Sequence, residues 1–156
     1  MSVATAEKRL LDLGIDLPAP AAPVANYVPF VKTGNLISIS GQIPILEGKL
    51  SFVGTVGADV TTDDACAAAR LCAINLIAQM KAACGGDLER VVRVVKLGGF
   101  VNGIDGFGQQ PIVINAASDL MVEVFGDKGR HSRSAVGVNG LPLGVPVEID
   151  ALVEIA

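Results

Sequence analysis

The sequence predicts an α+β fold in which a mixed β-sheet carries two long helices on one face. Two segments with helical spacing and recognisable caps alternate with segments of strand length and strand periodicity. The predicted order is a hairpin, a helix, a strand, a helix and two final strands. At 156 residues the chain is expected to form one domain with a substantial core. Because two helices cover only one face of such a sheet, the other face is expected to meet solvent or a partner.

The N-terminal part predicts a short helix followed by an extended linker. Residues 4–13 carry leucines at helical spacing, and the helix is expected to end at Gly14. Residues 17–23 contain three prolines, which favour an extended backbone.

A β-hairpin is predicted next. Residues 24–31 and 35–40 have the composition of strands, and the turn over residues 32–35 contains Gly34. Isoleucine and serine alternate in the second strand, which gives it one dry and one wet face. The strand is expected to end or bulge at residues 41–44, where glycine and proline occur.

The first long helix is predicted from Thr61 to about Cys84. Thr61 and Asp64 have the spacing of a capping box, and acidic residues favour the N-terminal end of a helix. Two glycines follow Cys84 and are expected to end the helix. Residues 91–101 are apolar on both faces and therefore predict a central strand.

The second half of the chain predicts a glycine-rich loop at 103–110, a helix at 112–125 and two terminal strands. The strands cover residues 133–138 and 145–153, on either side of a turn rich in glycine and proline. Every second residue of the last strand is apolar, and Glu148 lies on the opposite face of that strand.

The composition indicates a protein that associates with another subunit and not with a membrane or a nucleic acid. Hydrophobic residues make up 51% of the chain, which favours burial against a second copy. No segment reaches the roughly 18 apolar residues of a membrane span, and the N-terminus does not resemble a secretory signal, so a cytoplasmic location is expected. The net charge of −4 and the scattered basic residues argue against a nucleic-acid partner.

The cysteines and the single histidine do not predict a metal or cofactor site. Cys66, Cys72 and Cys84 are separated by 6 and 12 residues, which matches neither a zinc site nor a redox pair. We interpret them as small core residues in a reducing compartment. No glycine-rich segment precedes a helix as a nucleotide site requires. His131 is interpreted as an exposed loop residue, because strand neighbours point apart and its adjacent serines cannot form a triad with it.

Arg133 and Glu148 are the candidate site residues that the strand pattern brings out. Arg133 shares a face with small residues such as Ala135, and Glu148 lies on the non-core face of a nearby strand. We expect Ala135 on the uncovered sheet face with Leu36 and Leu152. A planar cation beside an open patch is suited to hold a small carboxylate. The same alternation is also typical of a solvated face with a weak ion pair.

Several short segments together resemble the Rid family, the YjgF-type proteins also described as L-PSP endoribonuclease-like. Their order and approximate separations match the family from about Pro18 to Ala156. The segments are Asn26-Tyr27, Gly34-Asn35-Leu36-Ile37, Ser40-Gly41-Gln42-Ile43-Pro44, Arg133-Ser134-Ala135-Val136, Leu141-Pro142 and Val147-Glu148-Ile149.

The resemblance implies a chorismate-mutase-like fold that assembles as a homotrimer, with active clefts between subunits. It implies hydrolysis of 2-imino or 2-enamino acids to 2-oxo acids and ammonia, with no metal and no cofactor. Arg133 matches the family arginine that binds the substrate carboxylate. Glu148 matches the glutamate that places or activates water.

Four further positions are implied as substrate-binding. Tyr27 matches a cleft tyrosine, Gly41 a backbone contact, and Asn115 a helix asparagine near the site; Ala135 stands where a cysteine is common. From the residues alone, Tyr27 fits a packed core or interface aromatic equally well, and Asn115 fits a helix-surface amide. Residues 1–17 form a helical extension longer than in compact members, which indicates a divergent branch.

Three functional hypotheses follow. The first is an imine deaminase, because a protonated imine needs only orientation by a cation and water activated by a carboxylate. The second is a non-catalytic sensor or binding protein for a small carboxylate-bearing molecule. The third is an endoribonuclease, which fits poorly with an acidic chain that lacks a basic and aromatic surface.

Overall fold

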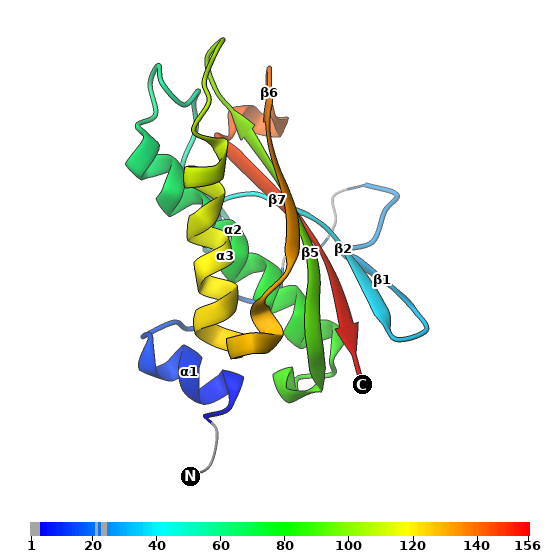
Figure 1. Cartoon of the computed structure of the whole chain (residues 1–156). Coiled ribbons are helices and arrows are strands. Elements are labelled where there is room, and N and C mark those ends of the chain that lie inside the picture. Colours follow the sequence, from blue (N-terminus) through cyan, green and yellow to red (C-terminus); the bar gives the residue numbers. More distant parts are fainter. Residues whose placement is uncertain (1–3, 21, 23–24) are drawn as a thin grey trace.

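The computed structural model describes residues 4–20, 22 and 25–156, in which helices cover one face of a mixed sheet (Figure 1). Five strands pair in the order β1-β2-β7-β5-β6, with β5 and β6 parallel and the other neighbours antiparallel. The helices are α1 (Ala6–Asp12), α2 (Thr62–Ala83) and α3 (Gln110–Phe125), with short 3₁₀ helices η1 (Leu88–Arg90), η2 (Gly126–Gly129) and η3 (Pro142–Gly144). The strands are β1 (Phe30–Thr33), β2 (Leu36–Gln42), β3 (Ile45–Leu46), β4 (Lys49–Leu50), β5 (Val91–Asn102), β6 (Ser132–Val138) and β7 (Val147–Ile155).

The two long helices lie side by side on one face of the sheet, as predicted (Figure 1). The core lies between them and the sheet, where Ile77 of α2, Met121 of α3 and Ile149 of β7 are completely buried. Every second residue of β7 is buried, which confirms the predicted apolar face of the last strand. The short α1 packs against α3.

Local capping explains where the helices begin and end. The Thr61 hydroxyl accepts a hydrogen bond from the backbone N–H of Asp64 at 3.1 Å, as the predicted cap requires. Gly14 has a φ of 69°, in the left-handed region that favours glycine, and follows the end of α1. Pro111 lies in the first turn of α3, where a missing N–H costs nothing, so the helix begins two residues earlier than predicted.

The predicted irregularity after the second strand is a β-bulge. Between Ile39 and Gln42 the strand β2 has one residue more than the paired part of β7, and Gly41 lies within this interval. The pairing resumes at Gln42, which pairs with Ile149 and is the last residue of β2 before the chain continues into β3.

Two parts of the N-terminal half differ from the prediction. The first strand spans only Phe30–Thr33, because Pro29 cannot donate to a sheet ladder and residues 25–28 form bends and a coil; residues 23 and 24 of the predicted strand lie outside the described residues. The hairpin of β3 and β4 was not predicted. Its turn has positive φ at Glu47 and Gly48, and strands of two residues show no periodicity from which to predict them.

Arg133 and Ala135 lie on the helix-covered face, so the prediction that Ala135 belongs to the uncovered face was wrong. Arg133 pairs with Leu97, and Ala135 pairs with Gly99. Leu97 is completely buried, and a Cβ on Gly99 would overlap Ile114 of α3. Paired residues on neighbouring strands project to the same face, so β6 turns its small residues toward α3.

The uncovered face of the sheet exposes large apolar side chains. Val31 is 54% exposed, Leu36 38% and Val136 44%. Glu148 lies on the same face as Val136, because both residues pair with Phe100 of β5. A face of this kind is typical of an interaction surface.

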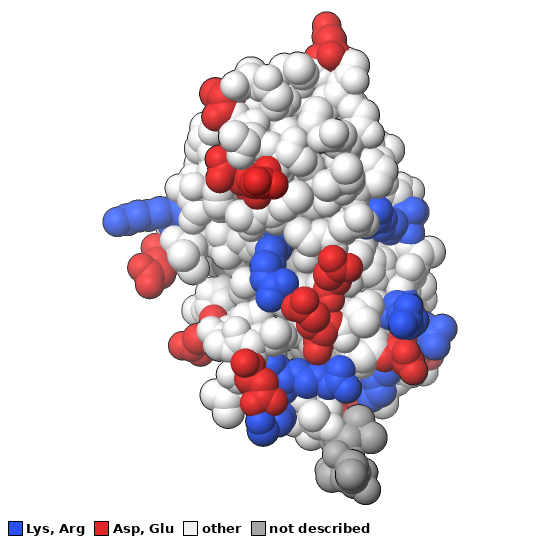
Figure 2. Space-filling model, turned by 60° about the vertical axis from the view of Figure 1, so that its left-hand side comes forward, with Lys and Arg blue, Asp and Glu red and all other residues white. Residues whose placement is uncertain are grey.

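Charges of both signs are interspersed on the side of the molecule where the helices lie (Figure 2). Arg70 of α2 pairs with Glu123 of α3 at 3.1 Å, and Lys81 of α2 pairs with Glu7 of α1 at 3.2 Å. The basic side chains form no continuous stripe in this view, unlike those of a typical nucleic-acid surface.

Candidate functional site

The predicted site residues fall into two groups on opposite faces of the sheet. Glu148 lies on the uncovered face and Arg133 on the covered face, and β5 separates their strands. Within one chain the arginine and the glutamate therefore do not share a site. The Glu148 half-site also contains Tyr27 and Gly41, and the Arg133 half-site also contains Asn115 and Ala135.

The Glu148 half-site lies in a cavity of about 720 Å³. The cavity is formed by the linker before β1, the end of β2, the β3–β4 hairpin, α2 and the turn before β7. Tyr27, Gly41 and Glu148 all line it. Much of the wall is apolar and comes from proline and aliphatic residues such as Pro18, Pro20, Pro29, Ile43, Ile45 and Leu143.

The side chain of Glu148 lies directly over Gly41 in the neighbouring strand. A Cβ on Gly41 would overlap the Oε1 atom of Glu148. The φ of Gly41 is not in the left-handed region, so the position requires glycine for its space and not for its backbone conformation. The predicted backbone contact at Gly41 thus adjoins the carboxylate.

The environment of Glu148 makes its carboxyl group a better proton acceptor. Burial raises the pKa of Glu148 above its ordinary value, and the negative charge of Asp150 raises it further. Asp150 lies two residues along β7, on the same face, and burial raises its pKa as well. A raised pKa brings a carboxylate closer to the strength that general-base chemistry near neutral pH requires.

A side chain that the sequence analysis missed holds the wall of this cavity. Asn75 of α2 donates hydrogen bonds to the carbonyl oxygens of Ile43 and Ile45, each at 3.0 Å. These bonds fix the chain where it leaves the bulge of β2. In the sequence Asn75 is one polar residue of a long helix, and its local pattern carries no sign of this contact.

The linker and Tyr27 form the outer side of the cavity. Ser40 donates a hydrogen bond to the carbonyl oxygen of Val28 at 2.8 Å, which ties the segment after Tyr27 to β2. Tyr27 is 53% exposed, so it lies at the cavity surface and not in the core. Residues 18–20 complete the wall, a role that their prolines alone did not predict.

The Arg133 half-site is built on α3. Arg133 donates from Nη1 to the hydroxyl of Ser118 at 3.0 Å and from Nη2 to the carbonyl oxygen of Pro111 at 3.2 Å. Asn115 is exposed on the same helix, four residues after Pro111 and three before Ser118, so it shares their helix face. Ala135 is partly buried and packs against the core.

His131 is half-buried and hydrogen-bonded, so its interpretation as an exposed loop residue was wrong. Its Nε2 lies 2.9 Å from the hydroxyl of Ser118, and its Nδ1 lies 2.6 Å from the carbonyl oxygen of Gly129. Burial lowers the pKa of His131, the hydrogen bond to Gly129 opposes this effect, and the positive charge of Arg133 lowers the pKa further. The lowered pKa therefore favours the neutral form of the imidazole.

Comparison with known proteins identifies the family. Residues 7–153 match the family model described as "YjgF/chorismate_mutase-like, putative endoribonuclease". The chain belongs to this family. Protein TCP17 of Trypanosoma cruzi is 51% identical over 92% of this chain and 89% of its own length.

Two solved structures resemble this YjgF-family chain over nearly its whole length. Atu1372 from Agrobacterium tumefaciens, of unknown function, is 50% identical with a TM-score of 0.91, and the match covers 97% of this chain and 92% of that chain. A "putative endoribonuclease" from Shewanella oneidensis is 39% identical with a TM-score of 0.94, and the match covers 97% of this chain and 100% of that chain. These likenesses confirm the resemblance and the chorismate-mutase-like α+β fold predicted from the sequence motifs.

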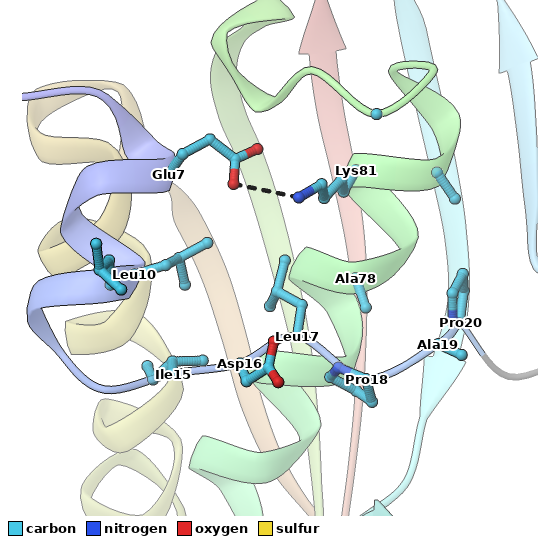
Figure 3. A pocket seen from close by; sticks show the side chains of 13 residues that line it. Glu7, Leu10, Ile15, Asp16, Leu17, Pro18, Ala19, Pro20, Ala78 and Lys81 are labelled. Carbon is cyan, nitrogen blue, oxygen red and sulfur yellow. Dashed lines mark hydrogen bonds and ion pairs between the residues drawn. The ribbon is translucent and has the colours of Figure 1, made fainter.

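A second cavity, of about 460 Å³, adjoins the first in this YjgF-family protein (Figure 3). It lies between α1 and α2, where the ion pair of Glu7 and Lys81 crosses its rim and Leu17 contributes to its wall. Residues 18–20 and Ala78 line both cavities. The linker after α1 therefore separates them.

The described ranges contain no group of three or more His, Cys, Asp or Glu residues that could hold a metal ion. Cys66, Cys72 and Cys84 are free thiols, and burial raises the pKa of Cys72 well above its ordinary value. Within those same ranges no helix has the length and apolar character needed to cross a membrane.

Proposed function

We propose that this YjgF-family protein is a deaminase that hydrolyses 2-imino or 2-enamino acids to 2-oxo acids and ammonia in clefts between copies of the chain. The separation of the two half-sites supports this proposal most directly. A guanidinium suited to a carboxylate lies on the helix-covered face of the sheet, whereas a glutamate with a raised pKa projects from the uncovered face and lines a cavity. Each half-site is incomplete in one chain, and a second copy would supply the missing part.

In this proposal the Arg133 half-site binds the carboxylate of the substrate. A guanidinium carries more N–H groups than the two that Arg133 donates to Ser118 and Pro111, so donors remain for a carboxylate. Asn115 is exposed on the adjoining helix surface and would contact the substrate amino or imino group. Both contacts would orient the imine carbon toward the Glu148 half-site of the neighbouring copy.

Glu148 then acts as the base and later as the acid. The substrate enters as the protonated imine. Glu148 accepts a proton from water as the water oxygen bonds to the imine carbon, and the C=N electron pair moves to nitrogen, which becomes a neutral amine. Glu148 returns the proton to that nitrogen, the C–N bond breaks with its electron pair leaving on ammonia, and the ammonia takes the hydroxyl proton, which leaves the 2-oxo acid and ammonium. The raised pKa of Glu148 suits both transfers.

The same proposal includes a homotrimer. Val31, Leu36 and Val136 expose apolar surface on the sheet face that no helix covers. Packing of this face against other copies would bury it and place the Arg133 edge of one sheet near the Glu148 cavity of the next.

Two other functions use the same residues. Binding of a small carboxylate without turnover needs Arg133 and the apolar cavity, and it does not need Glu148 as a base. Endoribonuclease activity, which the family description includes, has less support. Charges of both signs are interspersed on the helical side, and both nitrogens of His131 already contact protein groups (Figure 2).

A complementation experiment tests the deaminase and the shared cleft together. Arg133→Ala and Glu148→Gln subunits are each assayed for ammonia release from imines freshly generated by an amino-acid oxidase. They are then co-expressed in equal amounts and assayed as mixed oligomers. Each variant alone is expected to be inactive, and the mixture is expected to recover about one quarter of the wild-type activity, because that share of random clefts pairs an intact Arg133 with an intact Glu148.

The controls separate the possible failures. An inactive mixture in which the oligomers have formed would contradict a cleft that combines the two half-sites. Wild-type protein that binds a 2-oxo acid but does not accelerate imine hydrolysis would support the binding function. RNA cleavage that persists through extensive purification and disappears in Arg133→Ala would support the endoribonuclease.

A further inference from the structure

A chain of hydrogen bonds leads from the backbone to the guanidinium of Arg133. The Nδ1 atom of His131 lies 2.6 Å from the carbonyl oxygen of Gly129, and its Nε2 lies 2.9 Å from the hydroxyl of Ser118. The same hydroxyl lies 3.0 Å from Nη1 of Arg133. Ser118 of α3, Arg133 of β6 and His131, which precedes β6, thus form one hydrogen-bond network.

The donor and the acceptor of each hydrogen bond in this network follow from the groups at its two ends, the carbonyl oxygen of Gly129 and the guanidinium of Arg133. A carbonyl oxygen only accepts, so Nδ1 of His131 carries the proton that points to Gly129. The Nε2 of the neutral imidazole is then an acceptor and receives the Ser118 hydroxyl proton. The Ser118 oxygen keeps its lone pairs for Arg133, which only donates.

We propose that Ser118 and His131 are positioning residues that hold Arg133 in the orientation in which it binds the substrate carboxylate. This inference rests on the proposed function of Arg133. Pro111 of α3 provides a second anchor through its carbonyl oxygen, at 3.2 Å from Nη2. A long, flexible arginine held at two points loses its freedom before the ligand arrives, so binding costs less entropy.

Protonation of His131 would oppose this arrangement. It would place a second N–H donor against the Ser118 oxygen and a second positive charge beside the guanidinium of Arg133. The exposed charges on the adjoining elements are screened by solvent and act more weakly. They include Asp119 and Glu123 of α3, Asp127 and Lys128 of η2, Arg130 of the following turn, and Lys96 of β5.

The test measures binding of a 2-oxo acid, 2-oxobutanoate, by calorimetry, with imine hydrolysis measured separately. Ser118→Ala is expected to raise the Kd and the KM about tenfold and to leave kcat within about twofold. Ser118→Thr, which keeps the hydroxyl, is expected to restore most of the affinity. His131→Gln, which can still accept from Ser118, is expected to have an intermediate effect.

The pH dependence supplies a readout that a merely structural role would not change. In a Glu148→Gln background, which removes the titration of that carboxylate, the Kd is expected to rise as the pH falls through the lowered pKa of His131. Ser118→Ala is expected to flatten this rise, because the link between His131 and Arg133 is lost. Ser51, an exposed serine outside both cavities, provides the matched control Ser51→Ala.

Each outcome decides a different question. An unchanged Kd in Ser118→Ala, with an unchanged melting temperature, would overturn the positioning role. Loss of kcat with an unchanged Kd would also overturn it and would assign Ser118 to the chemistry. A tenfold weaker Kd without any turnover in the wild type would uphold the positioning role and reject the deaminase. If Ser118→Ala does not fold, Ser118→Thr and His131→Gln decide the question, and equal, pH-independent affinity in both would overturn it.

Discussion

The Glu148 half-site and the Arg133 half-site hold opposite charges in opposite ways. Glu148 lies in a cavity of about 720 Å³, over a glycine and beside a second carboxylate. Arg133 lies on the edge strand β6, where Ser118 and Pro111 of α3 hold its guanidinium. The surroundings of Glu148 destabilise its negative charge, whereas neutral hydrogen-bond partners orient the guanidinium of Arg133.

The difference fits the roles proposed for the two residues. A base must take up a proton, and burial together with a like charge raises its pKa and favours the protonated form. A residue that binds an anion must keep its charge and its geometry, and neutral hydrogen-bond acceptors provide geometry without cancelling charge. The predictions below test this contrast, beginning with the largest expected effect.

Replacing the cation should have the largest effect. Arg133→Ala is expected to lower kcat/KM about 1000-fold, because the bidentate hold on the carboxylate is lost. Arg133→Lys is expected to recover only part of this loss, since an ammonium is a point charge that cannot bind both oxygens in the same geometry. Steady-state kinetics with oxidase-generated imines measure kcat/KM of both variants. A kcat/KM of Arg133→Ala within about threefold of wild type would contradict the proposed role of Arg133 in binding the carboxylate.

Adding one methyl group under the base should have the next largest effect. Gly41→Ala is expected to displace the carboxylate of Glu148 and to lower kcat about 100-fold, because its Cβ would occupy the position of Oε1. Gly140→Ala is the matched control, since a Cβ there would meet no atom within 4 Å. Equal activity of the two variants would show that the position of Glu148 over Gly41 is not required.

Removing the second carboxylate should shift the pH profile. Asp150→Asn is expected to lower the pKa of Glu148 toward its ordinary value, because a like charge is lost. A base is active above its pKa, so the acidic limb of the kcat/KM profile should move to lower pH in this variant. An unmoved limb would show that Glu148 does not control it.

The smallest expected effect is on stability: neutralising the base, which abolishes activity, should stabilise the fold slightly. The pKa of Glu148 is higher in the folded state than in the unfolded chain. The free energy of unfolding therefore falls as the pH rises from the pKa of the unfolded chain through the raised pKa of the folded state. Glu148→Gln is therefore expected to raise the melting temperature slightly at pH 7 to 8 and to have no such effect below the pKa of an unfolded glutamate. Differential scanning calorimetry at both pH values measures this, and a lower melting temperature at pH 7 would contradict it.

Much of the fold was predictable from local signals. The caps of α2, the end of α1 and the apolar face of β7 each depend on a few neighbouring residues, and all three were confirmed. The short β3–β4 hairpin was missed, because strands of two residues have no periodicity. The start of β1 was misplaced, because apolar residues before Pro29 resemble a strand.

The faces of β6 show the limit of such reasoning. The alternation along β6 was correct, but the face assigned to the core was reversed. Val136 is the larger side chain and lies outside, whereas the small Ala135 lies toward α3. The helix packs so closely on the sheet that a Cβ on Gly99 would overlap Ile114, and small residues are what permit that approach.

The sequence by itself determined the helices, the buried face of β7 and the family motifs that single out Arg133 and Glu148. The tertiary structure decided that these two residues lie on opposite faces of one sheet and that Ser118 and His131 meet at the guanidinium. The physical reason is that local patterns report on neighbours along the chain. Which side of an edge strand meets a helix depends on how closely the two can pack, and the contacts that follow join residues far apart in the sequence.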